Sequence, residues 1–288
     1  MKKIYWILFL LFLSSMSFSQ EIIIYTIIPA SPINYTTPRT AFFSRLRNTV
    51  SFRHPIRSHP VGHLMVVLKN DSLYEVSGYS ANEMFKVYKA YLMKGIGLGV
   101  LFMPVPAKIE SIAHNDPQLK RRRKTGQMAY LRFKVSSEAF ERMWAYLNAY
   151  RQPQRHSNYL ILPSDPQKDS TAYCSSFAMS FLDVAQIGIH FKQNWLPDSA
   201  WNTTFKVPEY LIGRPFTTNK VGLLKLLFRG SHWATTSTLY REINLQNPSL
   251  LYDWIDTNWY FYKKHISLVA KPEKQGRAKG LFFDYSTR

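Results

Sequence analysis

The sequence predicts an α+β fold in which an antiparallel sheet packs against separate helices. Two observations support this class. Short aliphatic and β-branched runs joined by turn residues alternate with amphipathic stretches of helical period, and no internal repeat is present. The composition, with 46% hydrophobic and 15% aromatic residues, is that of a globular chain. One cysteine in 288 residues excludes a disulfide scaffold, and the composition excludes collagen-like and disordered classes.

The first part of the chain predicts strands and one helix. Turn residues at 69–72 separate two apolar runs and therefore predict a hairpin. Prolines 55 and 60 exclude a helix in the basic segment before it. We expect strands at 22–28, 64–68, 73–76 and 100–104, and a helix at 81–93.

The second part predicts two amphipathic helices. The first is capped by Ser136 or Ser137, and the second ends at Gly188. A basic run between Pro117 and Gly126 is expected to be a loop. We expect strands at 128–135 and 159–162, and helices ending at Tyr150 and spanning 171–187; residues beyond 200 are aromatic and basic and give no clear pattern.

The first 19 residues have the pattern of an export signal. Lys2 and Lys3 precede an apolar run at 4–13, and Ser17 and Ser19 place small side chains where a signal peptidase requires them. The run is shorter than the roughly 20 apolar residues that span a bilayer. We therefore expect cleavage before Gln20 and a mature protein that is periplasmic, outer-membrane-associated or secreted, without a transmembrane span.

The charge of the chain is strongly positive. Lys and Arg exceed Asp and Glu by 37 to 18, which gives +19. Such an excess favours anionic partners, and for an exported protein these are envelope lipids or polymers rather than nucleic acid. We expect the densest basic run to form an anionic-surface site made of Lys120, Arg121, Arg122, Arg123 and Lys124.

The lone cysteine, Cys174, lies in the first turn of the expected helix at 171–187, after a possible N-cap at Asp169 or Ser170. The positive end of a helix and its unpaired N–H groups favour a thiolate and can hold an oxyanion. A nucleophilic cysteine also needs a base and a group that orients the base. His63, at the head of the hairpin, is the candidate base, and Glu75 on the returning strand is the candidate orienter.

The hairpin loop decides whether Glu75 can meet His63, because side chains alternate between the faces of a strand. A two-residue loop would pair Val66 with Glu75 and place the two candidates on opposite faces. A three-residue loop would pair Val67 with Glu75 and place them on one face. The triad therefore requires an odd loop; an even one leaves the orienting role to another residue.

These residues resemble the circularly permuted branch of the NlpC/P60 papain-like superfamily, which includes YiiX-like hydrolases and the lecithin–retinol acyltransferase group. The resemblance covers residues 55–190 and is carried by Gly62-His63-Leu64-Met65-Val66-Val67 with Glu75, and by Tyr173-Cys174-Ser175-Ser176-Phe177-Ala178. It implies a papain-like domain with Cys174 as nucleophile, His63 as base and Glu75 as orienter. The acyltransferase branch has Asn before the cysteine, so Tyr173 favours the hydrolase side.

We therefore expect an exported cysteine hydrolase that acts on a cell-wall peptide or another envelope amide. Tyr173, Ser175 and His59 flank the nucleophile and the base and are the expected substrate contacts. No cofactor and no metal are expected, because no Cys or carboxylate lies at a ligand spacing from the histidines before the hairpin. The expected organisation is a signal peptide at 1–19, an extension at 20–54, the papain-like domain at 55–200 and a C-terminal extension at 201–288.

Two alternatives stay open at the level of sequence. A lipid acyl hydrolase or acyltransferase of the same fold would use the same three residues. A non-catalytic envelope protein would use the fold as a scaffold and the basic residues to bind an anionic polymer or membrane, and Cys174 would then be a buried apolar side chain.

Overall fold

The computed structural model describes residues 20–50, 61–82, 94–152, 158–160, 165–168, 171–265 and 269–287. The expected export signal, His59 and nearly all of the expected helix at 81–93 lie outside these residues. Within the described part of the chain, no helix has the length and apolarity needed to cross a membrane.

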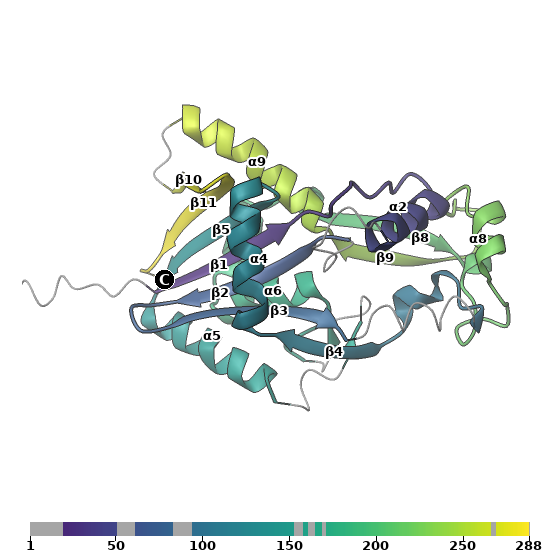
Figure 1. The fold of residues 1–288 in the computed structure, drawn as a ribbon, viewed down its shortest axis with the longest axis horizontal. Coiled ribbons are helices and arrows are strands. Elements are labelled where there is room, and N and C mark those ends of the chain that lie inside the picture. Colours follow the sequence, from purple (N-terminus) through teal and green to yellow (C-terminus); the bar gives the residue numbers. More distant parts are fainter. Residues whose placement is uncertain are drawn as a thin grey trace, which may run out of the picture.

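A nine-stranded sheet forms the body of the molecule (Figure 1). The strand order is β10-β11-β5-β1-β2-β3-β4-β6-β7, and all neighbours are antiparallel except the β11–β5 and β6–β7 pairs. The α+β class with a mostly antiparallel sheet is therefore confirmed. The strands are β1 (Glu21–Ile27), β2 (His63–Lys69), β3 (Tyr74–Ala81), β4 (Val105–Glu110), β5 (Met128–Val135), β6 (Asn158–Tyr159), β7 (Thr171–Ala172), β10 (Ala270–Gln275) and β11 (Ala278–Tyr285).

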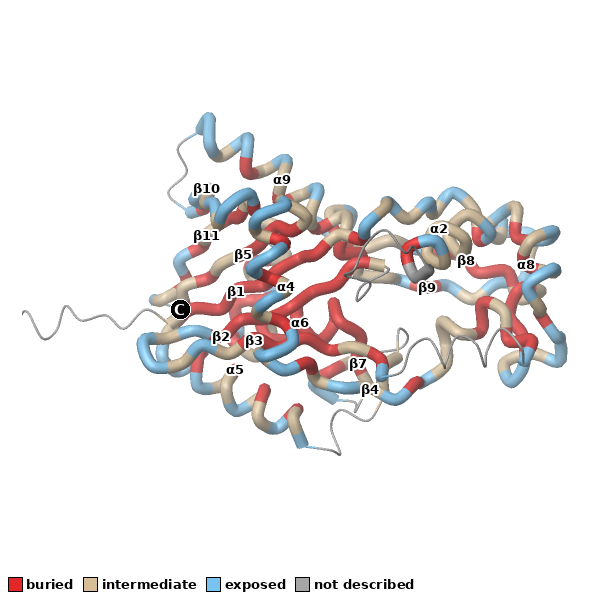
Figure 2. The backbone as a smooth tube through the Cα atoms, in the orientation of Figure 1, coloured by how far each residue is buried: buried red, intermediate tan, exposed pale blue. Residues whose placement is uncertain are grey.

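Helices cover both faces of this sheet. One face carries the larger core, in which alternate strand residues such as Ile24, Val66 and Phe133 meet the apolar stripes of four helices. These helices are α5 (Ser137–Tyr150), α6 (Cys174–Val184), α7 (Gly188–Asn194) and α9 (Pro248–Lys264). The other face packs against α4 (Ile112–Thr125) through a smaller core that contains Val67 and Leu119. The central strands are buried on both sides (Figure 2).

A second lobe extends from one end of the sheet (Figure 1). A two-stranded ribbon, β8 (Asn202–Pro208) with β9 (Tyr240–Gln246), forms its frame. A separate apolar core that includes Val207, Leu226 and Ile243 holds it together. The other elements of this lobe are α2 (Pro38–Val50), η1 (Leu98–Phe102), η3 (Glu209–Leu211) and α8 (Leu223–Arg229), and η2 (Asp198–Ala200) precedes the ribbon.

The segments expected as extensions contribute to the sheet itself. β1, from residues 20–54, lies between β2 and β5, and its side chains are buried along its whole length. β10 and β11, from residues 201–288, continue the sheet beyond β5. The sheet therefore depends on strands from both ends of the described chain, and residues 55–200 do not supply it alone.

Several expected elements occur where the sequence places them. The strands at 22–28, 64–68, 73–76 and 128–135 are present as β1, β2, β3 and β5. The first amphipathic helix is α5, and the Ser136 hydroxyl caps it by accepting from the N–H of Ala139.

Other expectations were wrong. The basic run is the last part of α4, which contains Pro117 and is held against the sheet by buried Leu119 and Arg122. A 3₁₀ turn, η1, replaces most of the expected strand at 100–104, and the strand that follows is β4. α6 starts at Cys174, after β7, and Gly188 begins α7. A Cβ at 188 would lie 2.0 Å from Oδ1 of Asp183, so any larger residue requires this carboxylate to move.

Candidate active site

His63 stands where two strands separate. β2 pairs with β1 as far as His63 opposite Ile27, but it pairs with β3 only as far as Met65 opposite Gly78. Beyond that point β3 continues beside β4 alone. Gly62, with φ of +86°, turns the chain into β2 at a point where a Cβ would meet the Ile27 carbonyl oxygen at 3.0 Å. The diverging strands leave room at the end of the sheet for a side chain from another element.

Cys174 fills that position as the first residue of α6. The short strand β7 leads directly into the helix, and Tyr173 is the N-cap. The Ser176 hydroxyl accepts from the Tyr173 N–H at 3.0 Å, which satisfies a backbone donor before the helix begins. His63 and the backbone N–H of Leu64, which lies beyond the last β2–β3 pair, both lower the pKa of the Cys174 thiol. Cys174 is 4% exposed.

Glu110, the last residue of β4, supplies the carboxylate beside the imidazole. Its Oε2 lies 3.3 Å from Nε2 of His63, and both side chains are buried. Gly78 on β3 lies between them and makes the contact possible, because a Cβ at this position would lie 2.9 Å from Nε2 and 2.5 Å from Oε2. Since Nε2 faces Glu110, we assign Nδ1, the second ring nitrogen, to the thiol.

Glu75 does not reach His63, so its expected role as orienter was wrong. The hairpin loop has four residues, with Lys69 opposite Tyr74 and Leu68 opposite Glu75. This even loop places Glu75 on the sheet face opposite His63 and near the closed end of the hairpin. There Glu75 forms an ion pair with Arg151.

The charges of the site favour a thiolate–imidazolium pair. Burial lowers the pKa of His63, but the Glu110 carboxylate and the hydrogen bond to Cys174 raise it more, so the net shift is upward. Burial raises the pKa of Cys174, but the hydrogen bond and charge of His63, with the Leu64 N–H and the Ser175 hydroxyl, lower it more. Both shifts favour transfer of the proton from the thiol to the imidazole.

Two hydroxyl groups complete the surroundings of the sulfur. Ser175 Oγ lies 3.8 Å from Sγ, and the Tyr159 hydroxyl donates to Sγ at 3.9 Å. Parallel pairing of Tyr159 with Ala172 places this phenol beside the start of α6. Burial and the neighbouring Cys174 raise the pKa of Tyr159 well above its ordinary value, so the phenol keeps its proton.

Of the three expected substrate contacts, the structure places only one beside the sulfur. Ser175 touches the sulfur, as described above. Tyr173 is buried, and its hydroxyl accepts from the N–H of Gln246 in the second lobe at 3.3 Å. His59 lies outside the described residues.

The basic run is only partly available to an anionic surface. Arg122 is buried and donates to the Ile28 carbonyl, and Arg123 donates to the Tyr25 hydroxyl at 2.8 Å. Lys120 pairs with Asp116 at 2.7 Å. A helix displays its charges around its circumference, so Arg122 and Arg123 face the protein and are not part of such a site.

Two functional candidates were missed from the sequence, Glu110 and Tyr159. Gly78 was the signal for the first, because an isolated glycine inside a strand often marks a close approach by another group. The strand expected at 100–104 obscured β4 and with it the position of Glu110. Tyr159 depends on a two-residue parallel contact that leaves no periodic pattern.

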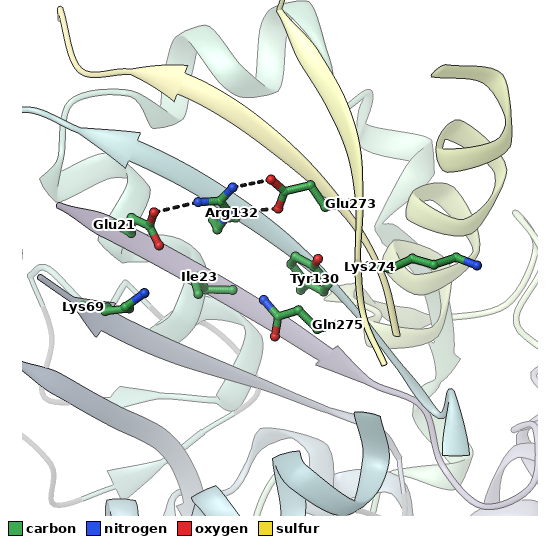
Figure 3. Close-up of a pocket in the computed structure, with 8 residues that line it drawn as sticks. All are labelled: Glu21, Ile23, Lys69, Tyr130, Arg132, Glu273, Lys274 and Gln275. Atoms are coloured by element: carbon green, nitrogen blue, oxygen red, sulfur yellow. Dashed lines mark hydrogen bonds and ion pairs between the residues drawn. The ribbon is translucent and has the colours of Figure 1, made fainter. Parts of the chain in front are cut away.

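A cavity of about 450 Å³ lies on the sheet face that also carries α4, beside β10 (Figure 3). Arg132 bridges Glu21 and Glu273 along it. Its lining also includes Lys69, the partner of Glu21 in the β1–β2 register. His63 is six residues from Lys69 on β2, which corresponds to about 20 Å of strand. This cavity is therefore separate from the candidate active site.

Within the described residues, no cluster of three or more His, Cys, Asp or Glu side chains is placed to hold a metal ion. Comparisons with protein-family models, with curated proteins and with solved structures found no match. The geometry of Cys174, His63 and Glu110 therefore carries the functional argument.

Proposed function

We propose that this protein is an exported cysteine hydrolase that cleaves an amide or ester through an acyl-enzyme on Cys174. The observation that supports it is the convergence of Cys174, His63 and Glu110 from three separate elements at the end of the sheet. A buried thiol, imidazole and carboxylate in series form the constellation that nucleophilic catalysis requires.

The reaction begins with attack of the Cys174 thiolate on the substrate carbonyl carbon, which forms a C–S bond and an oxyanion. The backbone N–H of Cys174 at the start of α6 and the Tyr159 hydroxyl are the donors for this oxygen. The leaving amine or alcohol takes a proton from the His63 imidazolium as its bond to the carbonyl breaks. A thioester remains on the sulfur.

In deacylation, His63 acts as a general base, whereas in acylation it acts as a general acid. His63, now neutral, takes a proton from water, and the resulting hydroxide equivalent attacks the thioester carbonyl. The carboxylic acid product leaves, and the thiolate–imidazolium pair is restored. Glu110 fixes the orientation of the imidazole throughout the cycle and stabilises it in the steps in which it is charged.

The chain order supports a papain-like, permuted NlpC/P60 arrangement, with the histidine on a hairpin strand before the cysteine at a helix start. A departure from the expected pattern is that the orienting carboxylate is Glu110 of the next strand. A cell-wall peptide or another envelope amide is the substrate class that this resemblance favours.

A second candidate function is a non-catalytic envelope protein. The burial of Cys174 and His63 favours it, because a nucleophile must be reached by its substrate. In that protein the thiol would be a core side chain, and its removal would destabilise the fold.

Purified protein from Gln20 onward tests the two functions. We expect the wild type to hydrolyse p-nitrophenyl acetate or to release peptides from isolated cell wall. Cys174→Ala should abolish turnover while the melting temperature stays within a few degrees. Cys174→Ser, which keeps the size of the side chain, serves as the second variant. Full activity in Cys174→Ala, or a loss of several kcal/mol in its stability, contradicts the hydrolase.

A further inference from the structure

The outer end of the second lobe exposes large apolar side chains. We call this surface the tip and define it by Leu223, Leu224 and Phe228 of α8 with Leu239 beside β9. Phe228 is 79% exposed, Leu239 78% and Leu224 68%. Exposed apolar side chains that gather in one place mark an interaction site, whereas scattered ones need no explanation.

Hydrogen bonds join the two parts of the tip through η3. The Leu239 carbonyl accepts from the N–H of Glu209, the first residue of η3, at 2.9 Å. The next residue, Tyr210, donates its hydroxyl to the Arg229 carbonyl at the end of α8 at 3.3 Å. α8 lies at one end of the long axis of the molecule (Figure 2).

Positive charge predominates around the tip. The segment 209–242 contains five Arg and Lys residues and two acidic residues, Glu209 and Glu242 at its ends, and Glu209 lies 3.9 Å from Arg241. α2 packs beside α8, where Arg39 donates to the Leu227 carbonyl at 3.2 Å, and the whole of α2 lacks acidic residues. The cations of the segment are Arg214, Lys220, Lys225, Arg229 and Arg241.

We propose that the tip docks this protein on the surface of an anionic phospholipid bilayer. Apolar side chains flanked by lysine and arginine are the combination that binds such an interface. The apolar groups enter the acyl boundary, and the cations meet the phosphates. A second copy of this chain is a poor occupant, because it would bring the same cations together. A soluble anionic polymer would pair the cations and leave Phe228 and Leu224 in water.

The docking surface and the candidate active site are separate. The β8–β9 ribbon runs from Pro208 and Tyr240 near the tip to Asn202 and Gln246, whose N–H bonds to Tyr173 next to the nucleophile. Six residue steps of strand correspond to about 20 Å. The proposal is therefore independent of hydrolysis and can be tested on Cys174→Ala protein.

Sedimentation with vesicles tests the proposal directly. The chain from Gln20 onward should bind vesicles containing phosphatidylglycerol more tightly than pure phosphatidylcholine vesicles, and high salt should weaken the binding. The double variant Leu224→Ser/Phe228→Ser should lower the partition coefficient by about tenfold or more, because two apolar anchors are lost. Lys225→Gln/Arg229→Gln should lower it by about tenfold, on phosphatidylglycerol vesicles only.

Matched controls come from the sheet body. Ile189 on α7 is 70% exposed, so Ile189→Ser removes an equally exposed apolar group. Arg121→Gln/Lys124→Gln removes two exposed charges from α4. Both controls should bind like the wild type. Unchanged binding by both tip variants, an equal loss in the controls, or a dimer that the apolar tip substitutions dissociate would overturn the proposal. Circular dichroism melts of every variant separate lost docking from lost folding.

Discussion

A glutamate lies at each end of the β2–β3 hairpin, Glu75 on β3 and Glu110 on the neighbouring strand β4, and the two glutamates have different surroundings. At the closed end, Glu75 pairs with partly exposed Arg151. At the open end, Glu110 meets His63 in a buried contact, where the strands separate and Cys174 enters. An ion pair near water contributes about 0–1 kcal/mol, whereas a buried carboxylate can change the protonation of its neighbour. The comparison teaches that burial and register, not distance along the chain, decide which carboxylate lies beside His63.

The largest difference is expected when the negative charge of each glutamate is removed in turn. Glu110→Gln should lower kcat/KM about 100-fold, because the imidazolium loses its buried counter-charge and general acid–base catalysis weakens. Glu75→Gln should change kcat/KM less than about twofold, since it removes only a partly exposed ion pair. Steady-state hydrolysis by the two variants measures the difference. An equal fall of kcat/KM in the two variants would show that Glu110 is no more important for activity than Glu75.

A smaller effect is expected from a methyl group placed between the side chains of His63 and Glu110. Gly78→Ala places a methyl group 2.9 Å from Nε2 and 2.5 Å from Oε2 and must push the two side chains apart. We expect kcat/KM to fall about tenfold as the imidazole is displaced. Ser77→Ala, one residue away on the opposite face, is the control and should keep full activity. Wild-type rates in Gly78→Ala would show that the His63–Glu110 contact does not serve catalysis.

The smallest effect concerns the phenol beside the sulfur. Tyr159→Phe removes one hydrogen-bond donor to Sγ and to the expected oxyanion, so kcat/KM should fall about fivefold with little change in KM. Tyr252→Phe, which removes a hydrogen bond to the Gly126 carbonyl, is the matched control and should leave the rates unchanged. A rise in KM alone would assign Tyr159 to substrate binding.

Local patterns predicted the elements that local chemistry determines. The strand β1, the β2–β3 hairpin and the Ser136 cap depend on residues within a few positions of the chain, and each is present. The hairpin loop, however, is 70–73 and not the expected 69–72. Cys174 and His63 could be named as candidates because their residue types are rare and their contexts specific. Whether the thiol turns over a substrate stays a prediction.

The remaining part of the site depends on contacts between distant segments. Asn70 accepts from the N–H groups of Ser72 and Leu73 and so closes a four-residue loop, which reverses the face of Glu75. Glu110 becomes a neighbour of His63 only because β4 pairs with β3 at Gly78. The basic run became helical because Leu119 and Arg122 are buried against the sheet, although Pro117 opposes a helix locally.

Alkylation of Cys174 by iodoacetamide, followed from acid to alkaline pH in the wild type, Glu110→Gln and Glu75→Gln, tests the central claim most directly. The wild-type thiol should react with a midpoint well below the usual thiol pKa of about 8.5, because the imidazolium stabilises the thiolate. Without Glu110 the buried imidazole becomes neutral and the midpoint should move up, whereas Glu75→Gln should leave it in place. A wild-type midpoint at or above the usual value, or the same midpoint in Glu110→Gln, would contradict the account.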